Sequence, residues 1–259
     1  MKGAILKGKY QVLELLARGG MGDIYLVSEL AKPKKIWVLK QIVWDTCDSE
    51  LDTVLFRQFQ NEGRLLTRLK HPMLPKIKEY FRENDNHFII REYIPGLTLQ
   101  EFLNRELFPP ALKQVRDWGL QICNLLEYLH ELTPPVIVND ITPGNLVLTP
   151  KGDLKMIDLG IARIMGDDGS GLPPGTPGYT APEALENGNI SPQSDIFELG
   201  VCLYVLAGKN PPYRMSEKSE KPVGSKEFDA IIRRAAENDP ARRYPRVTEL
   251  KAALQNLRV

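Results

Sequence analysis

Residues 136–148 read Val-Ile-Val-Asn-Asp-Ile-Thr-Pro-Gly-Asn-Leu-Val-Leu, and this stretch decides the fold. Two short apolar runs, each typical of a buried strand, enclose a polar loop that carries Asp140 and Asn145. A third strand-like run at 154–157 leads directly to Asp158. The sequence therefore predicts two acids and an amide beside the ends of short strands.

These three side chains have both a structural and a chemical interpretation. Asp140 and Asn145 could form Asx turns within their loop, and Asp158 could occupy another turn. Their order and separation favour chemistry. An acid and an amide in one loop, followed by a second acid after a short hairpin, supply oxygen ligands for Mg²⁺ and a base near a hydroxyl.

A glycine cluster lies far upstream, in a segment with the alternation of β-structure. Residues 10–44 give the signals of three strands, and the first turn among them is Gly19-Gly20-Met21-Gly22. Such a cluster serves equally well as a tight hairpin or as a phosphate cradle. In a cradle, glycines let backbone N–H groups approach phosphate oxygens without a Cβ in the way.

Lys40 and Glu62 form the next candidate pair. Lys40 closes the third predicted strand, and Glu62 lies on a predicted helix over 52–69, which His71-Pro72 ends. A lysine at a strand end and a glutamate on a helix are ordinarily both solvated. A buried Lys40–Glu62 pair would instead hold the lysine ammonium at the α- and β-phosphates of a nucleotide.

The remaining elements predict two lobes. Strand-like runs at 77–81 and 87–93 complete a strand-rich first third. The rest of the chain is mainly helical, apart from the short strands and a Gly/Pro-rich loop over 166–178. Predicted helices cover 111–132, 194–207, 226–237 and 247–257. We therefore expect domains at 1–94 and 95–259.

Composition narrows the functional classes. Lysine and arginine number 34 against 33 aspartates and glutamates, so no broad basic surface for nucleic acid or an anionic membrane is expected. Cys47, Cys123 and Cys202 match no metal spacing, and we interpret them as buried thiols of a reducing, cytoplasmic compartment. The apolar stretch 196–207 contains Glu198 and is too short to span a bilayer, so we expect a buried helix and no membrane segment.

Taken in order, these residues and their neighbours resemble the protein-kinase signature. The matching segments are Leu16-Ala-Arg-Gly-Gly-Met-Gly-Asp-Ile, Val38-Leu-Lys40, Glu62, Arg91-Glu-Tyr-Ile94, Asn139-Asp140-Ile-Thr-Pro-Gly-Asn145, Asp158-Leu-Gly160, Gly175-Thr-Pro-Gly-Tyr179, Ala181-Pro-Glu183, Ser194-Asp195 and Asp239-Pro-Ala-Arg-Arg243. The resemblance covers roughly residues 10–257. It implies an α+β, bilobal protein-kinase fold with a small β-rich N-lobe and a larger helical C-lobe. The glycine loop, Gly-Gly-Met-Gly-x-Ile-Tyr, and the catalytic loop, with Pro-Gly-Asn-Leu, are similar to those of bacterial serine/threonine kinases.

The resemblance implies an ATP- and Mg²⁺-dependent transfer of a phosphoryl group to serine or threonine hydroxyls of a protein substrate. Lys40, held by Glu62, would grip the α- and β-phosphates. Asn145 and Asp158 would hold Mg²⁺. Asp140 would accept the proton of the substrate hydroxyl or orient it, with the barrier lowered mainly by positioning and charge neutralisation.

The resemblance also implies an ATP pocket and two supporting contacts. The carbonyl of Glu92 and the N–H of Ile94 would bond the edge of adenine. The pocket would be lined by Leu16, Gly19, Gly20, Gly22, Ile24, Val38, Lys40, Glu92, Ile94 and Val147. Glu183 would form a structural ion pair with Arg243, and Asp195 would support the catalytic loop from beneath.

Among the positions that depart from the family pattern, three bear on control or activity. Asn139 replaces the arginine that partners a phosphorylated activation loop, so that mode of control is not expected. Thr142 stands where serine/threonine kinases carry a lysine beside the transferring phosphoryl, and losing one such contact typically costs about 3–4 kcal/mol, or about 10²–10³ in rate. Arg91 occupies an ordinarily apolar position. Its guanidinium either captures Glu62, so that Lys40 loses its anchor, or points away or reaches a phosphate.

Three functions compete for this pattern. The first is a serine/threonine kinase, slow but active, since the predicted base and metal ligands all remain. The second is a pseudokinase acting as a nucleotide-binding interaction and regulatory module, which Thr142 and Arg91 favour. The third is a small-molecule phosphotransferase of kinase-like fold. Residues 175–179 and 181–183 disfavour it, because they build a peptide platform that such enzymes generally lack.

Overall fold

The computed structural model describes residues 1–19, 22–42, 49–84, 86–106, 108–166, 175–208 and 225–258. These residues divide into two compact units. The first holds Met1–Pro95 together with Asp158–Gly160. The second holds Gly96–Ile157 and the described residues from Ile161 onward. The turn at 158–160 thus belongs to the first unit, although it lies far along the chain.

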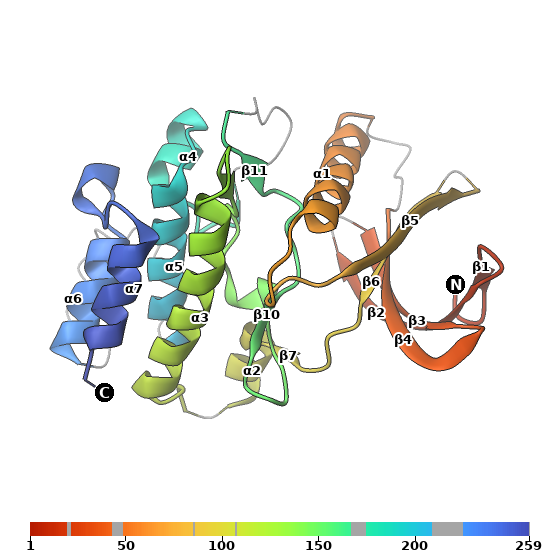
Figure 1. Cartoon of the computed structure of the whole chain (residues 1–259), viewed down its shortest axis with the longest axis horizontal. Coiled ribbons are helices and arrows are strands. Elements are labelled where there is room, and N and C mark those ends of the chain that lie inside the picture. Colours follow the sequence, from red (N-terminus) through yellow and green to blue (C-terminus); the bar gives the residue numbers. More distant parts are fainter. Residues whose placement is uncertain are drawn as a thin grey trace. The chain divides into compact units, whose positions relative to one another are not determined.

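The first unit is built on one antiparallel sheet of six strands in the order β1-β2-β3-β4-β6-β5 (Figure 1). The strands are β1 (Ile5–Leu6), β2 (Tyr10–Gly19), β3 (Gly22–Glu29), β4 (Lys32–Gln41), β5 (Ile77–Glu83) and β6 (Asn86–Glu92). Tyr10, Val27, Leu39 and Ile90 are buried in its core, one from each of four strands. The strands predicted from alternation are confirmed, and the structure adds β1, which is too short to show a period.

The first residue of β3, Gly22, must be a glycine. Gly22 has a φ of 123°, and a Cβ there would lie 1.9 Å from the carbonyl oxygen of Gln41 on β4. A side chain cannot fit this close approach of two backbones. Gly19 ends β2 and pairs with Gly22, whereas Gly20 lies outside the described residues.

Helix α1 (Ser49–Arg68) packs its apolar side against the sheet. Phe59 contacts Ile42 and Ile89 there. Glu62, one turn further along the helix, is completely buried. The glutamate therefore lies on the buried face of the helix and not on the solvated one.

The second unit is mainly helical. Its helices are α2 (Leu99–Arg105), α3 (Leu112–His130), α4 (Pro182–Asn187), α5 (Pro192–Leu206), α6 (Lys226–Ala235) and α7 (Val247–Asn256), with 3-10 turns η1 (Pro143–Asn145) and η2 (Pro240–Arg242). Helix α5 begins at a capping box from Ser191 and is buried from Ser194 to its end. It packs against α3, α6 and α7 (Figure 1). The predicted buried helix over the most apolar stretch is confirmed.

Two small sheets hold the loop of residues 138–145. Strands β7 (Leu97–Thr98), β9 (Leu146–Leu148) and β10 (Leu154–Met156) form one, and β8 (Val136–Ile137) pairs with β11 (Arg163–Ile164) in the other. The loop leaves β8 and enters β9, so both of its ends are fixed by strand pairing. The sequence did not predict β7, α2, β11 or α4, because each is too short to show a period and none is a continuous apolar run such as β8.

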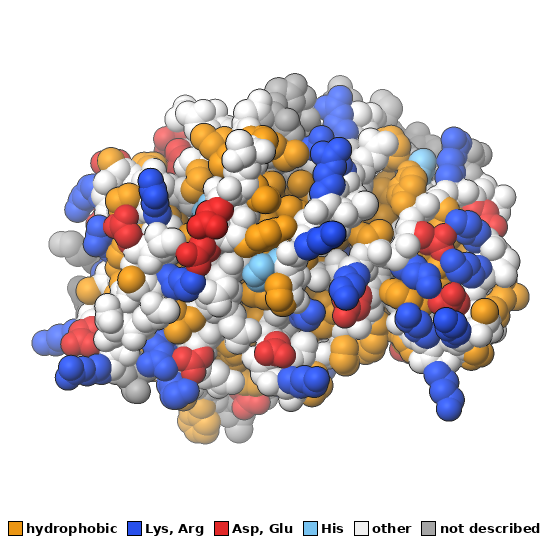
Figure 2. All heavy atoms as spheres, viewed as in Figure 1, with side chains coloured by type: hydrophobic (Ala, Val, Ile, Leu, Met, Phe, Trp, Pro, Cys, Tyr) orange, Lys and Arg blue, Asp and Glu red, His pale blue; other side chains and the backbone are white. Residues whose placement is uncertain are grey.

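Surface and helix properties agree with the mixed composition. Within the described residues, no helix combines the length and the apolar character that a membrane span requires. On the face drawn in Figure 2, Lys and Arg side chains are interspersed with Asp and Glu side chains in both units. The absence of nucleic-acid binding stays a prediction.

Candidate active site

The first unit brings Lys40 and Glu62 into direct contact. Lys40 lies on β4, opposite Ile24 on β3 and Ile89 on β6, and only 2% of it is exposed. Its Nζ donates to Oε2 of Glu62 at 2.5 Å. Of the two interpretations that the sequence left open, solvated side chains or a buried pair, the structure has the buried pair.

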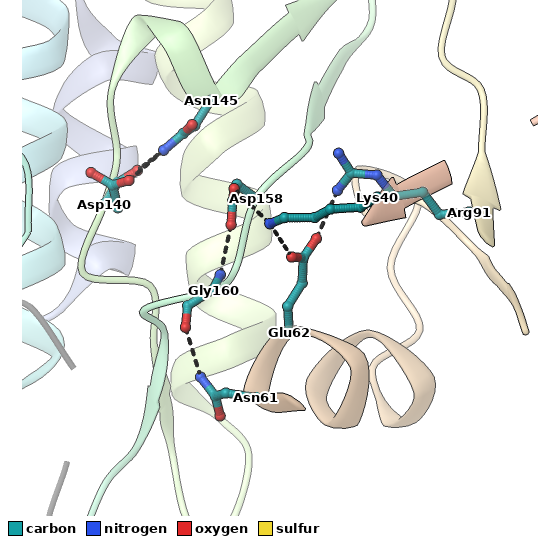
Figure 3. A network of polar contacts seen from close by, with 8 residues as sticks. All are labelled: Lys40, Asn61, Glu62, Arg91, Asp140, Asn145, Asp158 and Gly160. Atoms are coloured by element: carbon teal, nitrogen blue, oxygen red, sulfur yellow. Dashed lines mark hydrogen bonds and ion pairs between the residues drawn. The ribbon is translucent and has the colours of Figure 1, made fainter. Parts of the chain in front are cut away.

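Arg91 binds the same carboxylate from β6. Its Nη1 lies 2.7 Å from Oε1 of Glu62, so each carboxylate oxygen serves one cation (Figure 3). The prediction that capture of Glu62 by Arg91 would take the anchor from Lys40 is therefore wrong. A carboxylate has two oxygens with separate lone pairs, and the two strands deliver their cations to different ones.

Asp158 completes this group within the first unit. Its Oδ2 lies 3.4 Å from Nζ of Lys40, and its Oδ1 accepts the N–H of Gly160 at 2.7 Å. Asn61 on α1 donates from its side-chain nitrogen to the carbonyl oxygen of Gly160 at 3.3 Å. The helix that carries Glu62 therefore also holds the Asp158 turn (Figure 3).

The opposite charges of Lys40 and Asp158 stabilise the ionised form of both side chains. Burial alone would lower the pKa of Lys40, but the attraction of Asp158 and Glu62 outweighs it and raises that pKa. Burial alone would raise the pKa of Asp158, but Lys40 and Arg91 outweigh it and lower that pKa. Both side chains are charged at neutral pH. The result is a buried ammonium beside a carboxylate, the combination that a nucleotide phosphate and its metal require.

In the second unit, Asp140 is held by two neutral donors. Nδ2 of Asn145 donates to Oδ2 of Asp140 at 2.6 Å and to its backbone carbonyl at 3.1 Å. Oγ1 of Thr176 donates to Oδ1 of Asp140 at 2.5 Å. Since the amide nitrogen faces Asp140, the carbonyl oxygen of Asn145 is the atom that could ligate a metal.

Thr142, at the position of the missing lysine, is buried. Its carbonyl oxygen accepts the N–H of Asn145 at 3.1 Å, at the start of η1. The side chain in this position is neutral. At most one hydroxyl hydrogen bond could therefore replace the positive charge that the family pattern places there.

Asp195, on α5, supports the loop from below. Its Oδ2 accepts the N–H of Val138 at 3.0 Å and its Oδ1 that of Asn139 at 2.8 Å. His130 lies 2.8 Å from the same carboxylate. Asn139 has a φ of 59°, a left-handed backbone that asparagine adopts more readily than most residues. The expected support by Asp195 is present, and His130 is an addition that sequence analysis missed.

Glu183 and Arg243 form the expected structural pair. Nη1 and Nη2 of Arg243 each lie 2.7 Å from a different oxygen of Glu183. The guanidinium also donates to three backbone carbonyls. Burial alone would raise the pKa of Glu183, but the bonds from Arg243 outweigh it and lower that pKa.

The predicted adenine-pocket residues lie mostly in the first unit. Leu16 is on β2, Ile24 on β3, Val38 on β4 and Glu92 at the end of β6, with Ile94 just beyond. The N–H of Glu92 is already bonded to the carbonyl of Lys76 at 2.9 Å. Val147, on β9, belongs to the second unit, as does Asn145, whereas Asp158 belongs to the first.

Comparison with known proteins agrees with the geometry. Residues 10–257 match the family model described as a protein kinase domain. Serine/threonine-protein kinase PrkC of Bacillus subtilis is 26% identical over 98% of this chain and 41% of its own length. Serine/threonine-protein kinase C of a Synechocystis strain is 29% identical over 97% and 50%. The chain thus spans half or less of the length of these relatives.

A solved structure extends the likeness to the fold. The kinase domain of PknI from Mycobacterium tuberculosis superposes with a TM-score of 0.76 at 23% identity, covering 98% of both chains. The expected α+β fold, with a strand-rich and a helical unit, is confirmed.

Proposed function

The chain belongs to the protein kinase domain family, and from this premise we propose that it transfers the γ-phosphoryl group of ATP to serine or threonine hydroxyls of proteins. The observation that carries the proposal is the buried contact of Lys40 with both Glu62 and Asp158. A lone buried lysine would be expected to lose its proton. Here two carboxylates keep it charged, which suits a residue that binds phosphate.

We infer that Mg²⁺ serves the reaction, because each unit offers an oxygen of a type that this ion accepts. Asp158 and Asn145 offer a carboxylate and an amide oxygen, and Mg²⁺ in such sites is usually bound by one or two protein oxygens together with substrate phosphates. When bound, the ion would neutralise charge on the β- and γ-phosphates. Lys40 would hold the α- and β-phosphates. Asp140, positioned by Asn145 and Thr176, would orient the substrate hydroxyl and accept its proton.

Serine/threonine specificity rests on two supports. Relatives over nearly the whole chain bear the name serine/threonine-protein kinase. Thr176, in the segment expected to bind a peptide substrate, donates to Asp140. The reducing, cytoplasmic location expected from the cysteines belongs to the same proposal. Cys123 and Cys202 are buried free thiols, and Cys47 lies outside the described residues.

A pseudokinase is the second candidate, and Thr142 is the observation that favours it. Arg91 no longer does, because Lys40 retains its bond to Glu62. The deciding experiment follows radiolabelled phosphate from ATP to a generic protein substrate, with Asp140→Asn as the isosteric control. We expect label on serine or threonine, reduced about 100-fold or more in the control. Label no higher than background in both proteins, while ATP still binds, would establish the pseudokinase function instead.

A further inference from the structure

Helix α5 buries a second acid beneath the catalytic loop. Glu198 is only 1% exposed, and its Oε2 accepts the N–H of Ile141 at 2.9 Å. Ile141 directly follows Asp140, so this bond fixes the backbone next to the proposed base. The other oxygen, Oε1, is buried and has no hydrogen-bond partner among the described residues.

Asp195, three residues earlier on α5, is bonded differently. Positions three apart lie on the same side of a helix, so both carboxyl groups face the loop. Asp195 accepts bonds from two backbone N–H groups and contacts His130. Glu198 has one N–H for two oxygens. A buried ionised carboxylate with so few donors is costly, whereas a neutral carboxylic acid is much less so.

Three neighbouring carboxyl groups act on the charge of Glu198. Burial first, and then Asp195 on the same helix, raise the pKa of Glu198 well above its usual range. Asp140 on the loop and Glu183 on α4 act in the same direction, and the N–H of Ile141 opposes them. Beyond these groups, His130 on α3 contacts Asp195 and Arg243 pairs with Glu183. The protonated form is favoured. Its carbonyl oxygen can still accept the bond from Ile141.

We propose that Glu198 is a positioning residue, whose neutral carboxyl group anchors the catalytic loop at Ile141 and thereby fixes the Asp140 side chain. Its ionisation next to Asp195 would place two negative charges on one turn of α5 and loosen this anchor. This role rests on the proposed kinase activity for its catalytic consequence, but not for its structural one.

The catalytic test compares Glu198→Gln with Glu198→Ala across a pH series. Glutamine keeps the shape and the carbonyl acceptor without a titrating proton. We expect the kcat of the wild type to decline as pH rises through the raised pKa of Glu198. Glu198→Gln should retain most of the kcat and should not show this decline. Glu198→Ala, which leaves the Ile141 N–H unbonded, should lower kcat about tenfold with little change in the KM for ATP. Equal kcat values and equal pH profiles in all three proteins would overturn the proposal, as would an equal loss in both variants.

A second test does not need activity. Amide hydrogen exchange of residues 136–147 should be faster in Glu198→Ala than in the wild type and Glu198→Gln. Because the folded pKa of Glu198 is raised, its contribution to stability is complete below its unfolded pKa of about 4.3 and is lost as pH rises through the folded pKa. The melting temperature of Glu198→Gln should therefore rise relative to that of the wild type as pH increases. If the wild type transfers no phosphate but these shifts appear, the proposed function fails and the anchor stands. If exchange is unchanged in both variants, the anchor fails.

Discussion

Arg91 and Lys40 divide the Glu62 carboxylate between them, with Arg91 Nη1 at 2.7 Å from Oε1 and Lys40 Nζ at 2.5 Å from Oε2. Helix α1 is therefore tied to two neighbouring strands, β4 and β6, through one side chain. The arginine that looked like a competitor for Glu62 is a second anchor for it.

Replacement of Arg91 should weaken the fold more than the site. In Arg91→Met, Glu62 keeps Lys40 but loses a charged hydrogen bond, and we expect a loss of about 2 kcal/mol in the free energy of unfolding. Urea titration measures it. The matched control is Arg68→Met at the exposed end of α1, which should change stability by no more than about 0.5 kcal/mol. Equal stability of the two variants would mean that the Arg91 bond contributes nothing.

Nucleotide binding should depend on Lys40. Because a ligand that binds the folded state stabilises it, ATP with Mg²⁺ should raise the melting temperature of the wild type. Lys40→Met should reduce this shift, whereas Lys34→Met, on the exposed first half of the same strand, should not. The measurement is a thermal melt with and without nucleotide. An unchanged melting temperature of the wild type would count against both candidate functions.

Restoring a lysine at position 142 should increase turnover. The equatorial oxygens of the transferring phosphoryl gain charge in the transition state, and an ammonium stabilises that charge more strongly than a hydroxyl. We expect Thr142→Lys to raise kcat about 10- to 100-fold, with little effect on ATP affinity. Thr142→Ser serves as the control and should leave kcat low. A gain only when Arg91→Met is added would show that the Arg91–Glu62 bond limits activity after all.

The Glu183–Arg243 pair should give the protein an acid-sensitive stability. The pKa of Glu183 is lowered in the fold, so its contribution is present above the unfolded value of about 4.3 and is lost as pH falls through the folded pKa. Arg243→Met leaves a partly buried carboxylate without its ion-pair partner and should cost about 3 kcal/mol at neutral pH, with a smaller difference in acid. Its exposed neighbour offers a control, since Arg242→Met removes only a 3.4 Å surface pair with Glu237. A cost that does not change with pH would contradict the assignment.

Periodicity predicted the longer elements of the fold. The strands around Lys40 and the helix that carries Glu62 have enough residues for a pattern of period 2 or 3.6 to show. Elements such as β7 and α4 do not, and their positions depend on tertiary pairing and capping. The order of motifs, rather than any single motif, predicted which side chains would meet.

Local pattern could not predict how the charges would be shared. Whether Arg91 competes with Lys40 depends on which oxygen each strand faces, and a sequence does not specify that geometry. Glu198 did leave a signal, as the single acid within the apolar stretch 196–207. An isolated carboxyl group in a fully buried helix must either accept a hydrogen bond or stay protonated. In this protein the donor is the backbone N–H of Ile141 in the catalytic loop. The motif 175–179 placed Thr176 in the peptide platform but gave no signal of its bond to Asp140.

The turn at 158–160 has a consequence for dissecting the protein. It is part of the strand-rich unit, yet more than sixty residues of the helical unit separate it from Pro95 along the chain. A gene fragment that stops after Pro95 would encode Lys40, Glu62 and Arg91 without Asp158, and so two buried cations with one buried anion. The complementary fragment would carry residues 158–160 without Lys40 and Asn61, which they contact in the first unit. The two units are therefore not separable modules that could be shuffled or expressed alone, because the polypeptide crosses from one to the other and back to complete a single cluster of charges.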